Sequence, residues 1–145
     1  MAKPIVVIYT DGSCRPDGEG AWAAMLRHGD EVLHIAGNEK DTTNNRMEIM
    51  AVIRALSCLT TSCKVTIFTD SQYVQNGITT WVNKWKKKNW KTKSGDPVKN
   101  CDLWKQILEL RGQHQIKVHW VRGHSGHTEN EIVDSLAQTM SKLPV

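Results

Sequence analysis

The stretch I-V-V-I-Y-T-D-G-S, residues 5–13, indicates the fold. The uninterrupted apolar run Ile5–Tyr9 is followed directly by the turn-forming residues Asp11-Gly12-Ser13. Such a run predicts a buried central strand. The pattern recurs at residues 67–71, where Ile-Phe-Thr-Asp-Ser closes a second short apolar run. We therefore expect Asp11 just past the C-terminal end of the first strand and Asp70 just past the C-terminal end of the second.

Turn signals and hydrophobic periodicity predict the remaining elements. The turn Pro16-Asp17-Gly18 precedes two strands that a hairpin at His28-Gly29-Asp30 would join. Between Trp81 and Asn100 no period is clear. The other predicted strands are Gly20–Arg27, Glu31–Ala36, Val65–Phe68 and Ile116–Trp120. The first three predicted helices are one that carries Ile49, Val52, Ile53 and Leu56 and is broken by Cys58–Cys63, a short one that Ser71 caps and Gly77 ends, and one over Cys101–Leu110. A last helix begins at the capping box Thr128–Glu131 and turns Ile132, Val133, Leu136, Ala137 and Met140 inward.

The predicted order of elements is β-β-β-α-β-α-α-β-α. Hairpin connections come first and helical crossovers follow, which is typical of a mixed sheet with helices on its faces. The length of 145 residues suits one domain, residues 1–145, of the α/β class.

Composition limits the cellular setting. Hydrophobic residues make up 39% of the chain, enough for a buried core, and no apolar run is long enough to span a bilayer. The N-terminus lacks the features of a signal peptide. The four cysteines form no Cys-x-x-Cys pair and no zinc site, so we expect reduced thiols. We predict a soluble, cytoplasmic protein without a membrane partner.

Charge is concentrated in one segment. Residues 81–100 contain seven lysines and one aspartate, a net charge of +6, which leaves −2 for the rest of a chain whose total is +4. Tryptophans alternate with these lysines, and this pairing favours a nucleic-acid partner, because lysines neutralise phosphates and indoles stack on bases or pack against sugars. The alternative is a solubilising segment that its tryptophans anchor to the core.

The two aspartates that follow the strands suggest a metal site. If a crossover makes the strands parallel neighbours, Asp11 and Asp70 emerge at the same end of the sheet, where α/β proteins bind ligands. Two carboxylates so close repel each other unless a cation lies between them. Hard oxygen ligands favour Mg²⁺ or Mn²⁺ over zinc. The alternative is that both aspartates only form turns.

Three further residues have a candidate role and a structural alternative. Glu48 lies near a helix start, where Asn45-x-x-Glu48 also matches a capping box. Asp134 flanks the apolar stripe of the last helix and could equally be a solvated surface residue. His124, in a glycine-flanked loop, could shuttle protons or be an ordinary surface histidine. Spacing alone leaves each alternative open.

Taken together, these motifs resemble bacterial ribonuclease HI, of the type 1 ribonuclease H family. They follow that family's order and cover almost the whole chain. The motifs are Tyr-Thr-Asp11-Gly-Ser-Cys, Thr-Thr-Asn-Asn-Arg-Met-Glu48, Thr-Asp70-Ser-Gln-Tyr-Val, Trp-Lys-Lys-Lys-Asn-Trp-Lys-Thr, Pro-Val-Lys-Asn-x-Asp-Leu-Trp, Gly-Gln-His-Gln-Ile-Lys and Gly-His124-x-Gly-His-x-Glu-Asn-Glu-x-x-Asp134.

The resemblance implies the ribonuclease H fold, a five-stranded mixed sheet flanked by helices, and an enzyme that hydrolyses the RNA strand of RNA–DNA hybrids. It implies that four carboxylates hold two Mg²⁺ ions about 4 Å apart, and that Mn²⁺ can substitute for Mg²⁺. These are Asp11, Glu48, Asp70 and Asp134. Asp11 and Asp70 would bridge the metals, Glu48 would also touch a ribose hydroxyl, and His124 would assist turnover. The products would be a 5′-phosphate and a 3′-hydroxyl.

The resemblance also implies substrate contacts. Residues near the RNA strand would read the 2′-hydroxyl, the group that distinguishes RNA from DNA. A basic protrusion, Trp81–Lys99, would grip the hybrid with little sequence preference. The implied contacts are Gly12, Cys14, Asn44, Asn45 and Gln72 for the RNA strand, Thr43 and Arg46 for the DNA strand, and Trp81, Lys84, Trp85, Lys86, Lys87 and Lys88 in the protrusion. We expect a monomer that removes RNA primers and R-loops.

Two departures from the family pattern concern substrate contacts. The loop Arg15–Gly20 is shorter than the family's usual form, and Lys84 stands where asparagine is common. Two other functions remain as alternatives. One is a transposase, integrase or resolvase that cuts DNA on the same fold, and the other is a hybrid-binding module without activity. The Asn44-Asn45 pair, the protrusion and the four acids favour the hybrid nuclease.

Overall fold

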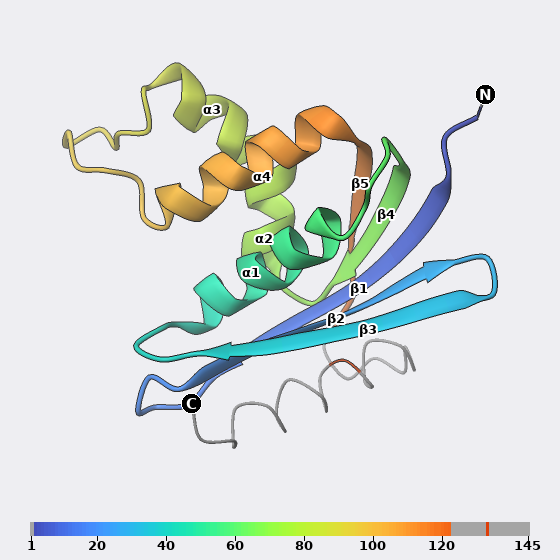
Figure 1. The fold of residues 1–145 in the computed structure, drawn as a ribbon. Coiled ribbons are helices and arrows are strands. Elements are labelled where there is room, and N and C mark those ends of the chain that lie inside the picture. Colours follow the sequence, from blue (N-terminus) through green and yellow to red (C-terminus); the bar gives the residue numbers. More distant parts are fainter. Residues whose placement is uncertain (1, 123–132, 134–145) are drawn as a thin grey trace.

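The computed structural model describes residues 2–122 and 133, and its strands form one five-stranded sheet (Figure 1). The strand order is β3-β2-β1-β4-β5. β2 and β3 continue the sheet antiparallel to β1, whereas β4 and β5 run parallel to it. The elements are β1 (Ile5–Cys14), β2 (Gly20–His28), β3 (Glu31–Glu39), α1 (Asn44–Ser57), β4 (Lys64–Thr69), α2 (Gln72–Asn76), the π-helical segment η1 (Gly77–Trp81), α3 (Val82–Lys87), α4 (Cys101–Gln113) and β5 (Gln115–Trp120).

β1 is the central strand, as its continuous apolar sequence predicts. Its parallel pairing with β4 stops at Tyr9, opposite Phe68, but its antiparallel pairing with β2 continues to Cys14, opposite Gly20. The strand is therefore longer than predicted, and Asp11 lies within β1 instead of past its end. The reason is that β2 continues to provide hydrogen-bond partners after β4 has turned away.

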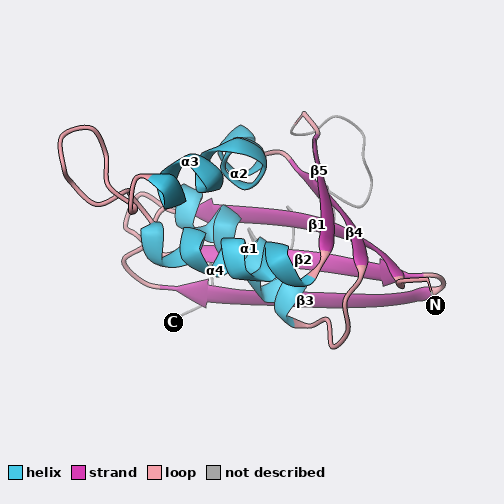
Figure 2. Cartoon of the chain, turned by 90° about the horizontal axis from the view of Figure 1, so that it is seen from above, coloured by secondary structure: helices cyan, strands magenta, loops and turns pink. Residues whose placement is uncertain are grey.

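The main core lies between the sheet and the helices. Figures 1 and 2 show helices α1 to α4 over the same face of the sheet. Val6 and Ile8 of β1 point into this core, where Trp104 of α4 is fully buried. A smaller cluster joins Ala23 and Met25 of β2 to Val133. Val133 is buried as the sequence predicted; the other residues of the predicted last helix lie outside the described residues.

Gly77 directly follows the last residue of α2, as predicted, but the chain stays helical beyond it. Ser71 does cap α2, accepting a hydrogen bond from the Val74 N–H at 3.1 Å, but the chain continues through η1 into α3. Gly77 is required for packing, because a Cβ atom there would overlap the indole ring of Trp104. The periodicity of α3 was missed because the lysines on its exposed face outnumber its buried residue, Val82.

The predicted hairpin is confirmed: His28 pairs with Glu31 across the two-residue turn Gly29-Asp30. α4 runs three residues further than predicted, to Gln113. Among residues 2–122, no helix is long and apolar enough to cross a membrane.

His114 joins the end of α4 to the loop before β4. Its side chain is buried, and its Nδ1 accepts a hydrogen bond from the backbone N–H of Cys63 at 3.0 Å. Burial lowers the pKa of His114 below its ordinary value of 6.5, and the charge of Lys3 lowers it further. Its neutral form is thus favoured in the folded chain.

This shift predicts a pH-dependent stability. Because the pKa of His114 is depressed on folding, the unfolded chain binds more protons as the pH falls below about 6.5, and stability falls with it. We expect the urea midpoint of the wild type to drop more between pH 7 and pH 5 than that of His114→Asn, whose amide oxygen takes the position of Nδ1 and can still accept the Cys63 hydrogen bond. Equal drops in the two proteins would contradict the assignment.

Candidate active site

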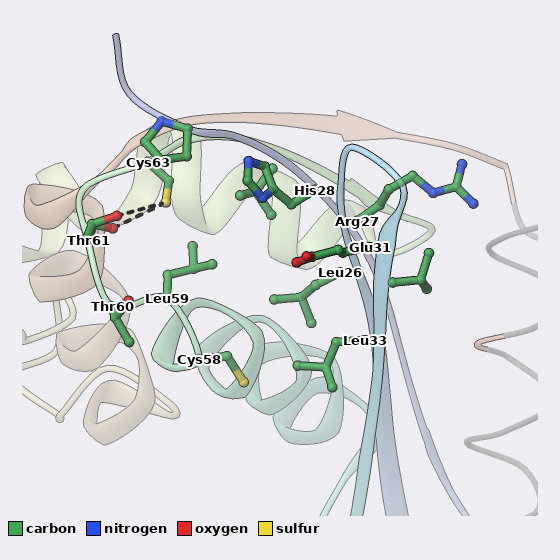
Figure 3. Close-up of a pocket in the computed structure, with 13 residues that line it drawn as sticks. Leu26, Arg27, His28, Glu31, Leu33, Cys58, Leu59, Thr60, Thr61 and Cys63 are labelled. Atoms are coloured by element: carbon green, nitrogen blue, oxygen red, sulfur yellow. Dashed lines mark hydrogen bonds between the residues drawn. The ribbon is translucent and has the colours of Figure 1, made fainter. Parts of the chain in front are cut away.

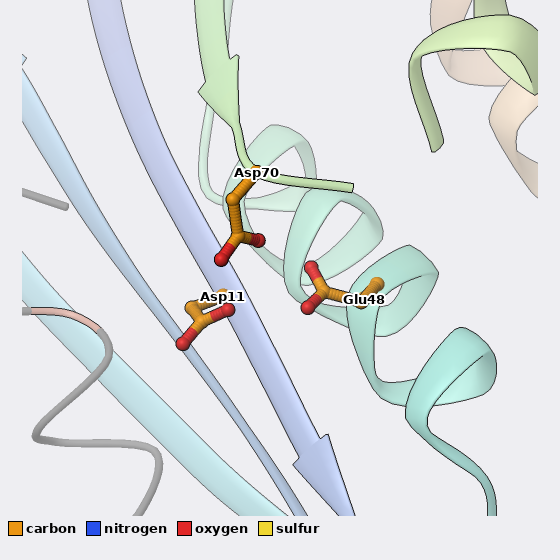
Figure 4. Close-up of side chains that lie close together, drawn as sticks. All are labelled: Asp11, Glu48 and Asp70. Atoms are coloured by element: carbon orange, nitrogen blue, oxygen red, sulfur yellow. The ribbon is translucent and has the colours of Figure 1, made fainter. Parts of the chain in front are cut away.

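Three carboxylates from three separate elements meet at one edge of the sheet (Figure 4). Asp11 comes from β1, Glu48 from α1 and Asp70 from the residue after β4. One oxygen of each lies within 4.8 Å of the other two. Asp11 and Glu48 are 4% and 8% exposed, whereas Asp70 faces solvent. Acids so far apart in sequence are therefore brought together by the fold alone.

Strand pairing places the two aspartates. β1 and β4 are parallel neighbours, as the prediction of a shared sheet end required. The backbone at Asp70 is then fixed by two hydrogen bonds. The indole N–H of Trp120 in β5 donates to the Asp70 carbonyl at 3.0 Å, and the Ser71 N–H donates to the buried Thr69 hydroxyl at 3.1 Å. Sequence reasoning missed both positioning residues, because neither contact leaves a sequence pattern.

Glu48 reaches the aspartates because α1 packs closely on β1. The helix is capped by Thr43, whose hydroxyl accepts a hydrogen bond from the Arg46 N–H at 3.2 Å. The alternative capping box starting at Asn45 is therefore wrong, and Glu48 is buried beside the aspartates instead. A Cβ atom on Gly12 would overlap the backbone of Met47 and Glu48, so only glycine allows this close approach.

The carboxylate cluster fits a divalent cation. Three negative groups at this separation repel one another, and a cation between them removes that cost. Their oxygen donors suit Mg²⁺ or Mn²⁺, which prefer hard ligands. Asp134 and His124, the other two predicted catalytic residues, lie outside the described residues.

The residues predicted to contact the RNA strand lie close to the clustered acids along the chain. Asn44 and Asn45 are exposed at the start of α1, and Gln72 is exposed at the start of α2. Gly12 follows Asp11 directly, and its steric role with α1 was not foreseen. The Cys14 thiol donates to the Thr42 carbonyl at 3.3 Å, which ties the end of β1 to the segment before α1.

The predicted basic protrusion combines exposed charge with anchored rings. All seven lysines of residues 81–100 are exposed. Trp81 and Trp85 are half-buried, and their ring centroids lie 5.7 Å apart. Trp85 also packs on Trp104 at 5.6 Å, and Tyr73 packs on both Trp81 and Trp104. The tryptophans therefore anchor this segment to the core, the role given above as the alternative to nucleic-acid binding, while the lysines around them stay available for an anion.

Arg46 makes an ion pair that the sequence did not reveal. Its guanidinium donates to both carboxylate oxygens of Asp102, at 3.1 and 3.0 Å, and to the Asn100 side-chain oxygen at 3.2 Å. The hydrogen bond from Arg46 lowers the pKa of Asp102 below its ordinary range. If Arg46 contacts the DNA strand as predicted, its guanidinium must do so while it is also bonded to Asp102, or must first leave Asp102.

A pocket of about 450 Å³ lies at the opposite end of the sheet (Figure 3). The β2–β3 hairpin and residues 58–63 line it, and none of the three clustered acids does. Two of its thiols donate to carbonyls: Cys58 to Arg54 at 3.3 Å and Cys63 to Thr61 at 3.2 Å. All four cysteines are free thiols, so Cys58 and Cys63 do not pair.

Comparison with known proteins then identifies the family. The RNase H family model matches residues 3–142. This chain belongs to the RNase H family. A ribonuclease H of Polynucleobacter asymbioticus is 56% identical over 137 residues, which cover 94% of this chain and 89% of the relative. Membership and the name of this relative place the chain among the ribonuclease H enzymes, as the sequence predicted.

Solved structures with the same fold confirm the predicted fold class. The type 1 enzyme LC9-RNase H1, described as carrying the type 2 active-site motif, has a TM-score of 0.85 and 32% identity, with 97% of this chain and 74% of that chain covered. A foamy viral protease-reverse transcriptase, solved with an RNA/DNA hybrid, shares the fold at a TM-score of 0.77 and 23% identity. The match covers 97% of this chain and 20% of that one.

The contact between Gly12 and α1 gives a test of the site's geometry. Gly12→Ala should push α1 away from β1 and carry Glu48 out of place. We expect a loss of stability of about 1–3 kcal/mol from overpacking and a fall in kcat of about 10²-fold, as displaced catalytic groups produce. Chemical denaturation and steady-state cleavage measure the two effects.

Gly112→Ala is the matched control, because a Cβ atom at this helical glycine meets nothing within 4 Å. It should leave activity unchanged and raise stability slightly, as alanine favours helix. If Gly12→Ala behaved like Gly112→Ala, the close packing would not set the position of Glu48.

Proposed function

We propose that this RNase H family member hydrolyses the RNA strand of RNA–DNA hybrids with two divalent metal ions. The observation that carries the proposal is the cluster of Asp11, Glu48 and Asp70 within 4.8 Å at the edge of the sheet. Family membership supports the reaction. In this mechanism Asp134 completes the ligand set, and the products carry a 5′-phosphate and a 3′-hydroxyl.

The clustered residues would hold the metals in distinct ways. Asp11, two residues beyond the last β1–β4 pair, and Asp70, directly after β4, would hold the ions from the sheet, and Glu48 would hold them from α1. Two Mg²⁺ ions held there would supply an activated water and would stabilise the negative charge that develops on the leaving oxygen. Because Asp11 and Glu48 are buried and fixed by packing, their oxygens are positioned before substrate arrives.

Substrate selection would depend on polar side chains beside the cluster. Asn44, Asn45 and Gln72 are exposed on the two helix starts nearest to Glu48 and Asp70, at positions suited to reading a 2′-hydroxyl. His124, in the loop before the last helix, would assist product release. A cytoplasmic location, a monomeric state and a role in removing primers and R-loops remain predictions.

The first experiment compares wild type with Asp70→Asn on a labelled RNA–DNA hybrid, with Mg²⁺ or EDTA. The substitution removes one metal-binding charge, and metal catalysis contributes several kcal/mol, so the cleavage rate should fall by at least about 10³-fold. The wild type should cut only the RNA strand and only with metal. The 5′-phosphate and 3′-hydroxyl ends are read by ligation of the products.

Asp30→Asn provides the control, because it makes the same chemical change in the β2–β3 turn at the other end of the sheet. This variant should cleave like the wild type. Single-stranded RNA and duplex DNA run alongside. Cleavage of duplex DNA would favour the resolvase–transposase class instead, and binding without cleavage would indicate a hybrid-binding module.

A further inference from the structure

Arg46 is held in a network of hydrogen bonds at the start of α1. Its bidentate ion pair with Asp102 uses both terminal nitrogens of the guanidinium, and one of them also bonds to Asn100. Asn100 in turn donates to the Tyr73 hydroxyl at 3.1 Å, and the Trp104 indole donates to the same hydroxyl at 3.2 Å. The network therefore joins α1, α2 and α4.

The two charges of the pair differ in exposure. The Arg46 side chain is 25% exposed, whereas that of Asp102 is 60% exposed. Asp102 can therefore leave the pair for water at small cost, while Arg46 is confined by its surroundings. Asp102 is exposed in the first turn of α4, two residues after the lysine-rich segment 81–100 along the chain.

This geometry has a consequence for an approaching polyanion. Without Asp102, Arg46 would present a full positive charge to an approaching phosphate. With Asp102 bound to Arg46, the phosphate instead meets an ion pair with no net charge. To reach the guanidinium it must displace Asp102 or share a donor with it. A carboxylate and a phosphate compete for the same planar fork of donors.

We propose that Asp102 competes with the hybrid's backbone phosphate for Arg46 and thereby weakens hybrid binding. Asp102 is a positioning residue: it orients the guanidinium while the site is empty and helps to release the phosphate after cleavage. The inference rests on the proposed function, because it takes the hybrid as the ligand. It assigns a role to an acidic side chain that the sequence analysis left without one.

The test measures hybrid binding in EDTA, where no cleavage occurs, over about 50–200 mM salt. The proteins are wild type, Asp102→Asn, Arg46→Ala and the double variant. We expect Asp102→Asn to lower Kd about two- to fivefold at low salt, the range of an exposed charge pair. The slope of log K against log salt should steepen by up to about 0.9, the value for one added phosphate contact. In the Arg46→Ala background the same substitution should change neither quantity.

Glu109→Gln is the matched control. It removes one negative charge from the same helix, and Glu109 is exposed. If it steepened the slope as much as Asp102→Asn does, the effect would be one of net charge, and the proposal would fail. The proposal would fail equally if Asp102→Asn bound the hybrid more weakly, since Asp102 would then serve only to hold Arg46 in place.

Two further readouts separate folding and function from the inference. Asp102→Ser, which keeps a residue favourable at a helix start, repeats the test if the asparagine variant unfolds at lower temperature. Wild-type cleavage of the hybrid with Mg²⁺ is measured in parallel. Absence of cleavage would overturn the proposed function, whereas normal cleavage with an unchanged Kd and slope in both Asp102 variants would overturn this inference alone.

Discussion

The close contact between α1 and β1 at Gly12 is the constraint on which the site depends. A strand and a helix normally stay apart by the width of their side chains, but here the Gly12 position meets the helix backbone at Met47 and Glu48. The apolar residues of α1 that follow, from Ile49 to Leu56, pack into the main core and hold the helix there. Core packing therefore supplies the energy that keeps a glutamate beside an aspartate.

That arrangement is unfavourable in electrostatic terms and so has to be imposed. Asp11 and Glu48 are buried acids, and Asp70 adds a third carboxylate to the cluster. Buried carboxylates this close together repel each other and lose hydration, which destabilises the fold unless a cation lies between them. A cluster that folding does not require is better explained by chemistry than by stability.

Much of this was predictable from the sequence, and the exceptions have physical causes. The strand runs before Asp11 and Asp70 identified the central strands because apolar continuity reports burial directly. Spacing could not join Glu48 to the aspartates, since that contact depends on the helix–strand distance that Gly12 permits. The resemblance to a family supplied that link. The helical course through Gly77 was missed because a glycine that packs under Trp104 looks, in sequence, the same as one that ends a helix.

The aromatic cluster gives the molecule a way to couple the basic protrusion to the carboxylates. Tyr73 packs on Trp81 and Trp104, and its hydroxyl accepts hydrogen bonds from Trp104 and Asn100. It lies three residues after Asp70 along the chain. α2, η1 and α3 follow one another without an intervening loop. The lysines of α3 are therefore connected to the aromatic cluster around Tyr73 by continuous helix and packed rings. The lysine-rich segment is therefore held in place relative to Asp70 by packed rings and continuous helix.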